Sequence, residues 1–196
     1  MPAQPAEQMA HDLHFVREAL ESSRAVRYRS LAIPLLWATV ILVGFVLNDF
    51  GSLSAVGLYW GIVSPIAGIL SGWLGTRVER IAGVQNDRAQ DWRECLHWLT
   101  IFAGFVAVGV ITATHGFDAR RAGQWMTLVF GLVYFLGGLH LDARFLLPGL
   151  AAIAGSAAVD HLGPYSWSIV GAVIAGSLVV GAFWKKGADV QDTPQG

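Results

Sequence analysis

Charged side chains are distributed unevenly along this chain, and six long segments contain no Asp, Glu, Lys or Arg. Within them apolar residues occupy every face of a helix, as in Leu36–Leu47 and Ile101–Ile111. A helix rising about 1.5 Å per residue crosses about 30 Å of hydrocarbon in roughly 20 residues. The pattern therefore predicts an all-α polytopic membrane protein, a bundle of six transmembrane helices at about residues 31–48, 53–75, 96–115, 123–141, 145–162 and 165–184.

The fifth apolar segment, Phe145–Val159, is shorter than the others. It becomes long enough if Asp160 and His161 lie at the level of the lipid headgroups and the helix ends at Gly163-Pro164. A soluble bundle would need a polar stripe on each helix, and a transmembrane β-barrel would need alternating strands. The sequence has neither pattern, which favours membrane-embedded helices.

Basic residues are concentrated on one of the two sides that six spans define. Eleven of the 13 Lys and Arg residues lie before the first span, in the second and fourth connections, or after the last span. The other two, Arg120 and Arg121, lie in the third connection. Under the positive-inside rule this asymmetry places both termini in the cytoplasm. Residues 1–30 lack the apolar core of a secretory signal, so we expect the first span to act as an uncleaved anchor.

Residues 1–29 form a polar cytoplasmic segment, and residues 187–196 form a cytoplasmic tail. Apolar residues recur at spacings of three or four within 7–29, which predicts an amphipathic N-terminal helix. They are Met9, Leu13, Val16 and Leu20. Three arrangements remain open: the helix lies on the membrane surface, it pairs with a partner protein or a second copy, or it covers the inner mouth of the bundle.

One stretch of this segment resembles a known group. Asp12-Leu-His-Phe-Val-Arg-Glu-Ala-Leu-Glu21, followed by Ser22-Ser23, is similar to the opening of a group of uncharacterised small bacterial multipass membrane proteins. The resemblance implies a location in a bacterial inner membrane. It supplies no activity and no site residues.

Composition excludes several classes of protein. Hydrophobic residues make up 54% of the chain and charged residues 14%, and the net charge of −1 gives no basic surplus for nucleic acid. The single cysteine, Cys95, allows no intramolecular disulfide. The sequence contains no Gly-x-Ser-x-Gly, no His-Glu-x-x-His and no P-loop. We therefore expect neither catalytic residues nor a cofactor.

Small residues and a proline mark the second span. Ser64 and Pro65 lie at its centre, and a proline there removes a backbone hydrogen bond, which predicts a packing kink or a broken helix beside a pathway. Small residues at close helical spacing suit tight helix contacts in a membrane. In this span they are Gly57, Gly61, Ser64, Gly68 and Gly72. The fifth and sixth spans carry similar sets, so the chain is expected to form a compact bundle or an oligomer interface.

Histidine and carboxylate residues lie near the ends of the spans. On the predicted outer side these are Asp49, His115, Asp118, Asp160 and His161. The predicted inner side has His97, His140 and Asp142, together with the cysteine Cys95. Imidazole, thiolate and carboxylate groups bind divalent metals, but neither set has a fixed ligand spacing. Helix caps and salt bridges are the main interpretation of both sets, with an ion site as the alternative.

Three functions remain open at this stage. The first is a small non-enzymatic membrane subunit, a sensor or accessory partner, that acts in the lipid bilayer through helix association. Its partner would be a second copy or another protein, bound through the N-terminal helix and the small-residue faces. The second is a channel or transporter for a small solute. The third is a metal- or haem-binding membrane enzyme.

Overall fold

The computed structural model describes residues 31–82, 88–116 and 118–183, and side chains outside 78–91. The amphipathic helix predicted within 7–29 and the tail at 187–196 lie outside the described residues. The described chain is helical, and its main elements are a first helix described over Leu31–Phe50, α2 (Leu53–Ala82), α3 (Arg88–His115), α4 (Ala119–His140), α5 (Leu146–Ala158) and α6 (Ser166–Phe183). Short 3₁₀ turns, η1 (Ala143–Phe145) and η2 (Val159–His161), flank α5.

Within residues 31–82, 88–116 and 118–183, six helical segments are long and apolar enough to cross a membrane, which confirms the six apolar helices predicted there. The fifth reaches 19 residues because η1 and η2 extend α5 at both ends. Gly163, at a φ of 79°, follows η2 and precedes Pro164, so the chain turns where the sequence predicted. Gly116, at a φ of 66°, follows α3 in the same left-handed conformation, which glycine adopts without strain.

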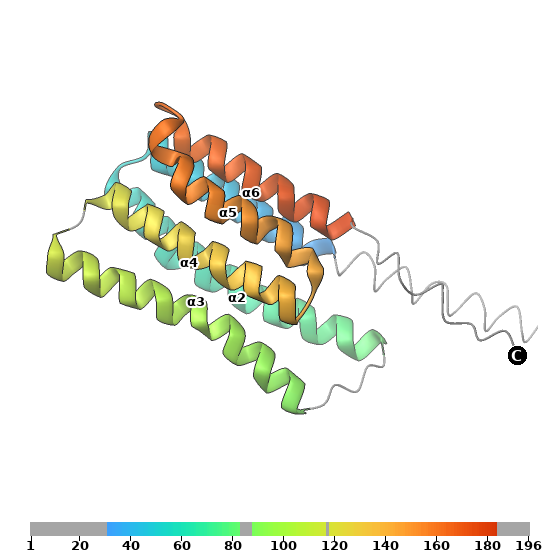
Figure 1. The fold of residues 1–196 in the computed structure, drawn as a ribbon. Coiled ribbons are helices and arrows are strands. Elements are labelled where there is room, and N and C mark those ends of the chain that lie inside the picture. The colour runs from blue at the N-terminus through green and yellow to red at the C-terminus, as the bar shows by residue number, and fades with distance from the viewer. Residues whose placement is uncertain (1–30, 83–87, 117, 184–196) are drawn as a thin grey trace, which may run out of the picture.

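The charges of the connection Arg77–Glu94 predict a solvated loop, with a helical extension or a turn on the membrane surface as alternatives, and the structure shows the helical extension. Helix α2 continues to Ala82 and α3 begins at Arg88, so most of the stretch is helical. Arg, Glu, Gln and Ala are good helix formers, and their charges do not oppose a helix that water can solvate. As a result α2 and α3 are longer than the other helices and extend past α4 at this end of the bundle (Figure 1).

The helices pack in the order α2, first helix, α6, α5, α4, α3 (Figure 1). The contacts between α4 and α5, α5 and α6, and α6 and the first helix enclose the core. Its buried members come from the first helix, α4, η2, α5 and α6. They are Ala38, Ile41, Phe45, Tyr134, Ala152, Val159, Trp167, Val170, Ile174, Ala175 and Leu178.

Glycines allow the central helices to approach closely. A Cβ placed on Gly131 of α4 would lie 2.7 Å from the backbone nitrogen of Ile153 in α5. A Cβ on Gly149 of α5 would lie 2.7 Å from Cα of Phe135 in α4. Both contacts are with backbone, so only glycine fits at this separation of the helices. Such close approach brings many atoms of the two helices into van der Waals contact, which stabilises the pair.

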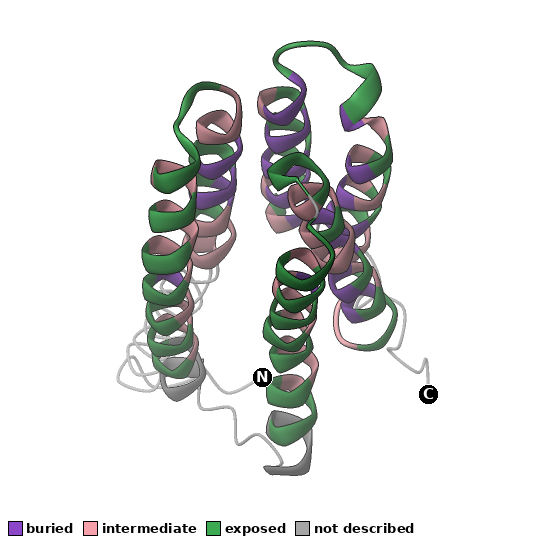
Figure 2. Cartoon of the chain, turned by 90° about the vertical axis from the view of Figure 1, so that its left-hand side faces the viewer, coloured by how far each residue is buried: buried purple, intermediate pink, exposed green. Residues whose placement is uncertain are grey.

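Helices α2 and α3 lie at the two edges of this arrangement and are the most exposed (Figure 2). Only 6% of the apolar window of each is buried, against 50% for α6. Helix α2 packs on the first helix, where the Tyr59 hydroxyl donates to the carbonyl oxygen of Val40 at 2.8 Å. The Trp37 indole N–H donates to Oγ of Ser71 at 2.9 Å. Helix α3 packs on α4, so each edge helix has one main neighbour.

Candidate functional site

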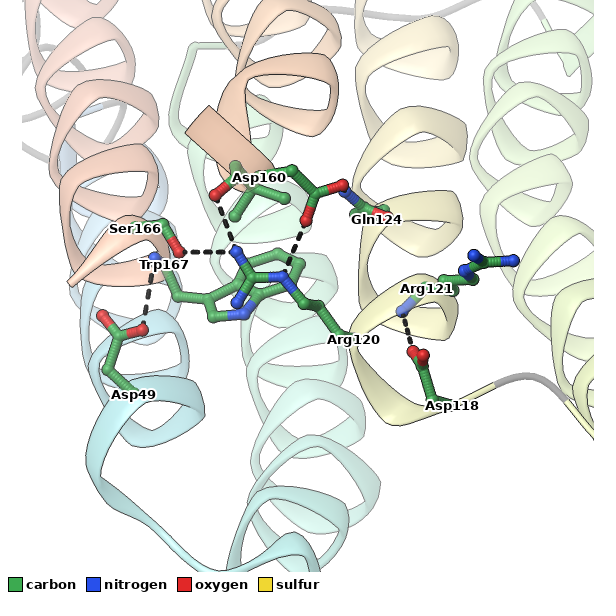
Figure 3. A network of polar contacts seen from close by, with 9 residues as sticks. Asp49, Asp118, Arg120, Arg121, Gln124, Asp160, Ser166 and Trp167 are labelled. Atoms are coloured by element: carbon green, nitrogen blue, oxygen red, sulfur yellow. Dashed lines mark hydrogen bonds and ion pairs between the residues drawn. The ribbon is translucent and has the colours of Figure 1, made fainter. Parts of the chain in front are cut away.

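The N-terminus of α6 is capped by a carboxylate from a distant helix. Asp49, at the end of the first helix, accepts a hydrogen bond from the backbone N–H of Trp167 at 3.3 Å (Figure 3). It also accepts one from the backbone N–H of Ser168 at 2.7 Å. The Ser168 hydroxyl donates to the same carboxylate at 2.7 Å. The first N–H groups of a helix have no partner within it, and the helix dipole favours an anion there. Asp49 therefore fixes α6 against the first helix.

Arg120, in the first turn of α4, connects three elements at the same end of the bundle (Figure 3). Its Nε donates to Oδ1 of Asp160 at 2.7 Å, and its Nη2 donates to the carbonyl oxygen of Val159 at 2.8 Å. The same Nη2 lies 3.2 Å from Oγ of Ser166, which is fully buried. One guanidinium thus holds α4 to η2 and to the start of α6.

Local sequence explains how α4 presents this group. Asp118 caps α4 by accepting from the backbone N–H of Arg121 at 2.7 Å, which sets the first turn. Arg120 and Gln124 are four residues apart and so share one face of the helix. Nε2 of Gln124 donates to Oδ2 of Asp160 at 2.7 Å. We call Asp49, Arg120, Gln124, Asp160, Ser166 and Ser168 the polar cluster.

The residues predicted for an outer-face ion site serve separate partners. Asp118 caps α4, and Asp160 pairs with Arg120 across 2.7 Å. Nδ1 of His115 lies 2.9 Å from Oγ1 of Thr114, and His161 follows Asp160 in η2. Among the described residues no three His, Cys, Asp or Glu side chains are grouped closely enough to hold a metal ion.

The four residues predicted for an inner-face site are likewise not gathered. Cys95 of α3 is exposed, and His140 is exposed at the end of α4. Nε2 of His97 lies 3.1 Å from the carbonyl oxygen of Val133, so this histidine joins α3 to α4. Asp142 caps η1 and forms an ion pair with Arg144 at 2.6 Å. In this geometry His97 and Asp142 have packing and capping partners within the bundle.

At the predicted kink, α2 runs without interruption through Ser64 and Pro65. Pro65 is exposed on the outside of the bundle and Ser64 is half-buried. The helix is therefore not broken at this position. A role for the two residues beside a pathway stays a prediction.

The glycines of α2 differ sharply from those of the central helices. A Cβ added at any of five α2 glycines would meet no heavy atom within 4 Å. These five define the open glycine face of α2: Gly57, Gly61, Gly68, Gly72 and Gly75. By contrast, a Cβ at Gly155 of α5 would meet Val170 and one at Gly171 of α6 would meet Phe45, so the small residues of the fifth and sixth spans serve contacts within the bundle.

Sequence reasoning did not single out Arg120, Gln124, Ser166 or Ser168. The only local signal was the capping residue Asp118 followed by two polar side chains four residues apart in the first turns of the fourth span. Their partners lie 36 to 46 residues away for α4 and 119 residues away for Ser168. Comparison of the chain with protein-family models, with curated proteins and with solved structures found no match.

Proposed function

We propose that this protein is a non-enzymatic membrane subunit, located in a bacterial inner membrane, that acts by helix association through the open glycine face of α2. The observation that carries the proposal is the contrast between glycines. A Cβ on any glycine of α4, α5 or α6 except Gly176 would meet a neighbouring element, whereas a Cβ on any of five glycines of α2 would meet nothing within 4 Å. In lipid, rows of small residues allow the close approach that drives helix pairing.

The exposed apolar surface supports an environment of lipid. Large hydrophobic side chains such as Ile69 of α2 at 75% and Val106 of α3 at 66% are exposed in the single chain. A soluble monomer rarely exposes contiguous apolar patches beyond a few hundred Å². Lipid or another membrane helix removes this surface from water at no cost in polar contacts.

The positions of basic residues support an orientation with both termini in the cytoplasm. Arg120 and Arg121 lie at the end of the bundle that carries the α5–α6 connection (Figure 1). Arg77, Arg93 and Arg144 belong to segments at the opposite end. Under the positive-inside rule the end with more basic residues faces the cytoplasm. In intact cells, a tag fused to the C-terminal tail of the protein is therefore expected to be protected from an external protease. Cleavage of that tag from outside would refute this orientation.

The association is tested on the purified chain in mild detergent by light scattering coupled to size exclusion. For the wild type, we expect the protein mass within the protein–detergent complex to exceed the 21.1 kDa of one chain. A Gly61→Leu, Gly68→Leu double variant should fall to the monomer mass, because bulky side chains then separate the helices that meet there. Gly109→Leu is the matched control, since Gly109 is an open glycine on α3.

Two results would refute the proposal. One is a wild-type chain that runs as a 21.1 kDa monomer with no other chain bound to it. The other is a double variant that keeps the complex while circular dichroism shows an intact fold. Because a Cβ at Gly61 or Gly68 meets nothing within 4 Å, misfolding is not the expected effect of either substitution.

A further inference from the structure

An apolar groove lies at the end of the bundle opposite the polar cluster. It is enclosed by η1, α5 and the last turn of α6, and its volume is about 250 Å³. The lining residues are Ala143, Arg144, Leu146, Leu147, Leu150 and Gly181. Leu147 and Leu150 are 40% and 51% exposed, so the groove opens onto the outer, apolar surface of the bundle.

The position of η1 against α6 depends on Gly181. A Cβ on this glycine would lie 2.8 Å from the carbonyl oxygen of Arg144, so a larger residue would push the two segments apart. This close backbone contact sets the base of the groove. It also holds Arg144 beside the apolar walls.

Among the described residues, Arg144 is the one charged residue that lines this groove. Its Nε and Nη2 donate to Oδ2 of Asp142 at 2.8 and 2.6 Å, which holds the guanidinium in a set orientation. The side chain is still 47% exposed, and Nη1 has no hydrogen-bond partner among the described residues. An exposed guanidinium donor therefore lies next to the apolar groove, at the end of a predicted span.

We propose that this groove binds one membrane phospholipid, with an acyl chain along Leu147 and Leu150 and the phosphate on the Arg144 guanidinium. The ligand must combine an apolar chain with an anionic group, because the leucines of the site contact an apolar chain and the arginine attracts an anion. Guanidinium–phosphate hydrogen bonds are charge-assisted and directional. Asp142 balances the charge of Arg144, so a soluble anion gains little there.

The acyl chain supplies what the charge alone does not. A chain held in the groove keeps its own phosphate near Arg144 at high effective concentration. The larger groove between the first helix and α6, about 340 Å³, is lined by Leu35, Ala38, Thr39, Leu42, Ala172, Ala175, Gly176 and Val179. Within the part of the chain that the structure describes, no charged residue lines it, so these residues give it no selectivity for a phosphate.

Three probes separate the two halves of the site. Delipidated full-length protein in detergent is titrated with dioleoyl phosphatidylglycerol, with dioleoylglycerol, which lacks the phosphate, and with inorganic phosphate, which lacks the chain. Native mass spectrometry then counts bound molecules. We expect one retained phosphatidylglycerol per chain, no saturable dioleoylglycerol and no phosphate. Equal retention of dioleoylglycerol would overturn the role of Arg144, and saturable inorganic phosphate would overturn the role of the groove.

Variants test the same site from both sides. Arg144→Gln should weaken phosphatidylglycerol retention about tenfold, the loss expected for a charge-assisted hydrogen bond, and Arg144→Lys should restore part of it. Ala143→Leu should weaken retention by filling the groove, with the Asp142–Arg144 pair in place. Arg77→Gln, which removes an exposed arginine of α2, is the matched control and should change nothing. Unchanged retention in both Arg144→Gln and Ala143→Leu would overturn the proposal.

Discussion

The contact between α4 and α5 predicts that Gly149→Ala destabilises the bundle strongly. The added Cβ would lie 2.7 Å from Cα of Phe135 and closer still to its backbone nitrogen. Ordinary contacts between such atoms are about 3.5 to 4 Å. Because backbone atoms cannot rotate aside as a flexible side chain does, the two helices must separate by a substantial part of this difference.

The size of the effect follows from two opposed terms. Overpacking of a close contact costs about 1–3 kcal/mol, and a clash with backbone belongs near 3. Exchange of glycine for alanine within a helix returns at most about 1 kcal/mol. We therefore expect the free energy of unfolding to fall by about 2 kcal/mol. Gly176→Ala, where a Cβ meets nothing within 4 Å, should lose nothing and gain at most about 1 kcal/mol.

The assay is reversible unfolding in mixed micelles by titration with SDS, followed by tryptophan fluorescence. The two variants receive the same methyl group on different helices, so the comparison isolates the contact from the chemistry. A Gly149→Ala protein that is as stable as Gly176→Ala would show that α4 and α5 are not in contact at this separation. Gly131→Ala, which faces the backbone nitrogen of Ile153, should repeat the loss.

The remaining predictions concern polar contacts, and the first two variant pairs use the same unfolding assay. Asp49→Ala should cost about 1–2 kcal/mol, because α6 loses its cap, while Asp49→Asn keeps an acceptor and should cost less; equal losses would argue against capping. Arg120→Lys should be clearly destabilising because lysine cannot reproduce the bonds to Val159 and Ser166, whereas Asp160→Asn should cost less than about 1 kcal/mol since that ion pair is exposed; the reverse order would refute this ranking. Trp37→Phe should increase amide hydrogen exchange in α2 by removal of the bond to Ser71, and exchange that stays at the wild-type rate would show that this bond does not hold α2.

The polar cluster shows why long-range pairs could not be predicted. Sequence analysis placed Asp49, Asp118 and Asp160 near one end of the bundle from the alternation of spans and connections, and it favoured caps and salt bridges for them. Which group each carboxylate would meet depends on how the helices are arranged around the bundle. Asp49 and Ser168 are 119 residues apart, and no local spacing links them.

The helical content of the second connection illustrates a different limit. The lack of charge indicates where lipid can surround a helix, but it does not indicate where a helix ends in water. For this reason the apolar pattern placed the span near 53–75, whereas α2 continues to Ala82. The predicted span is the part of α2 that can lie in lipid, whereas the whole helix also includes a charged part that water can solvate.

The sequence by itself determined that six apolar helices form, because a backbone with long runs of apolar side chains must satisfy its own hydrogen bonds wherever water is absent. It also indicated that the chain turns at Gly163-Pro164, where a glycine of positive φ precedes the proline. Only the tertiary structure decided which small residues lie in close contacts between helices. The spacing of glycines gives each helix the capacity for close approach, but contact requires a neighbour. Neighbouring elements pack against every glycine of α4, α5 and α6 except Gly176, while the glycine face of α2 stays open.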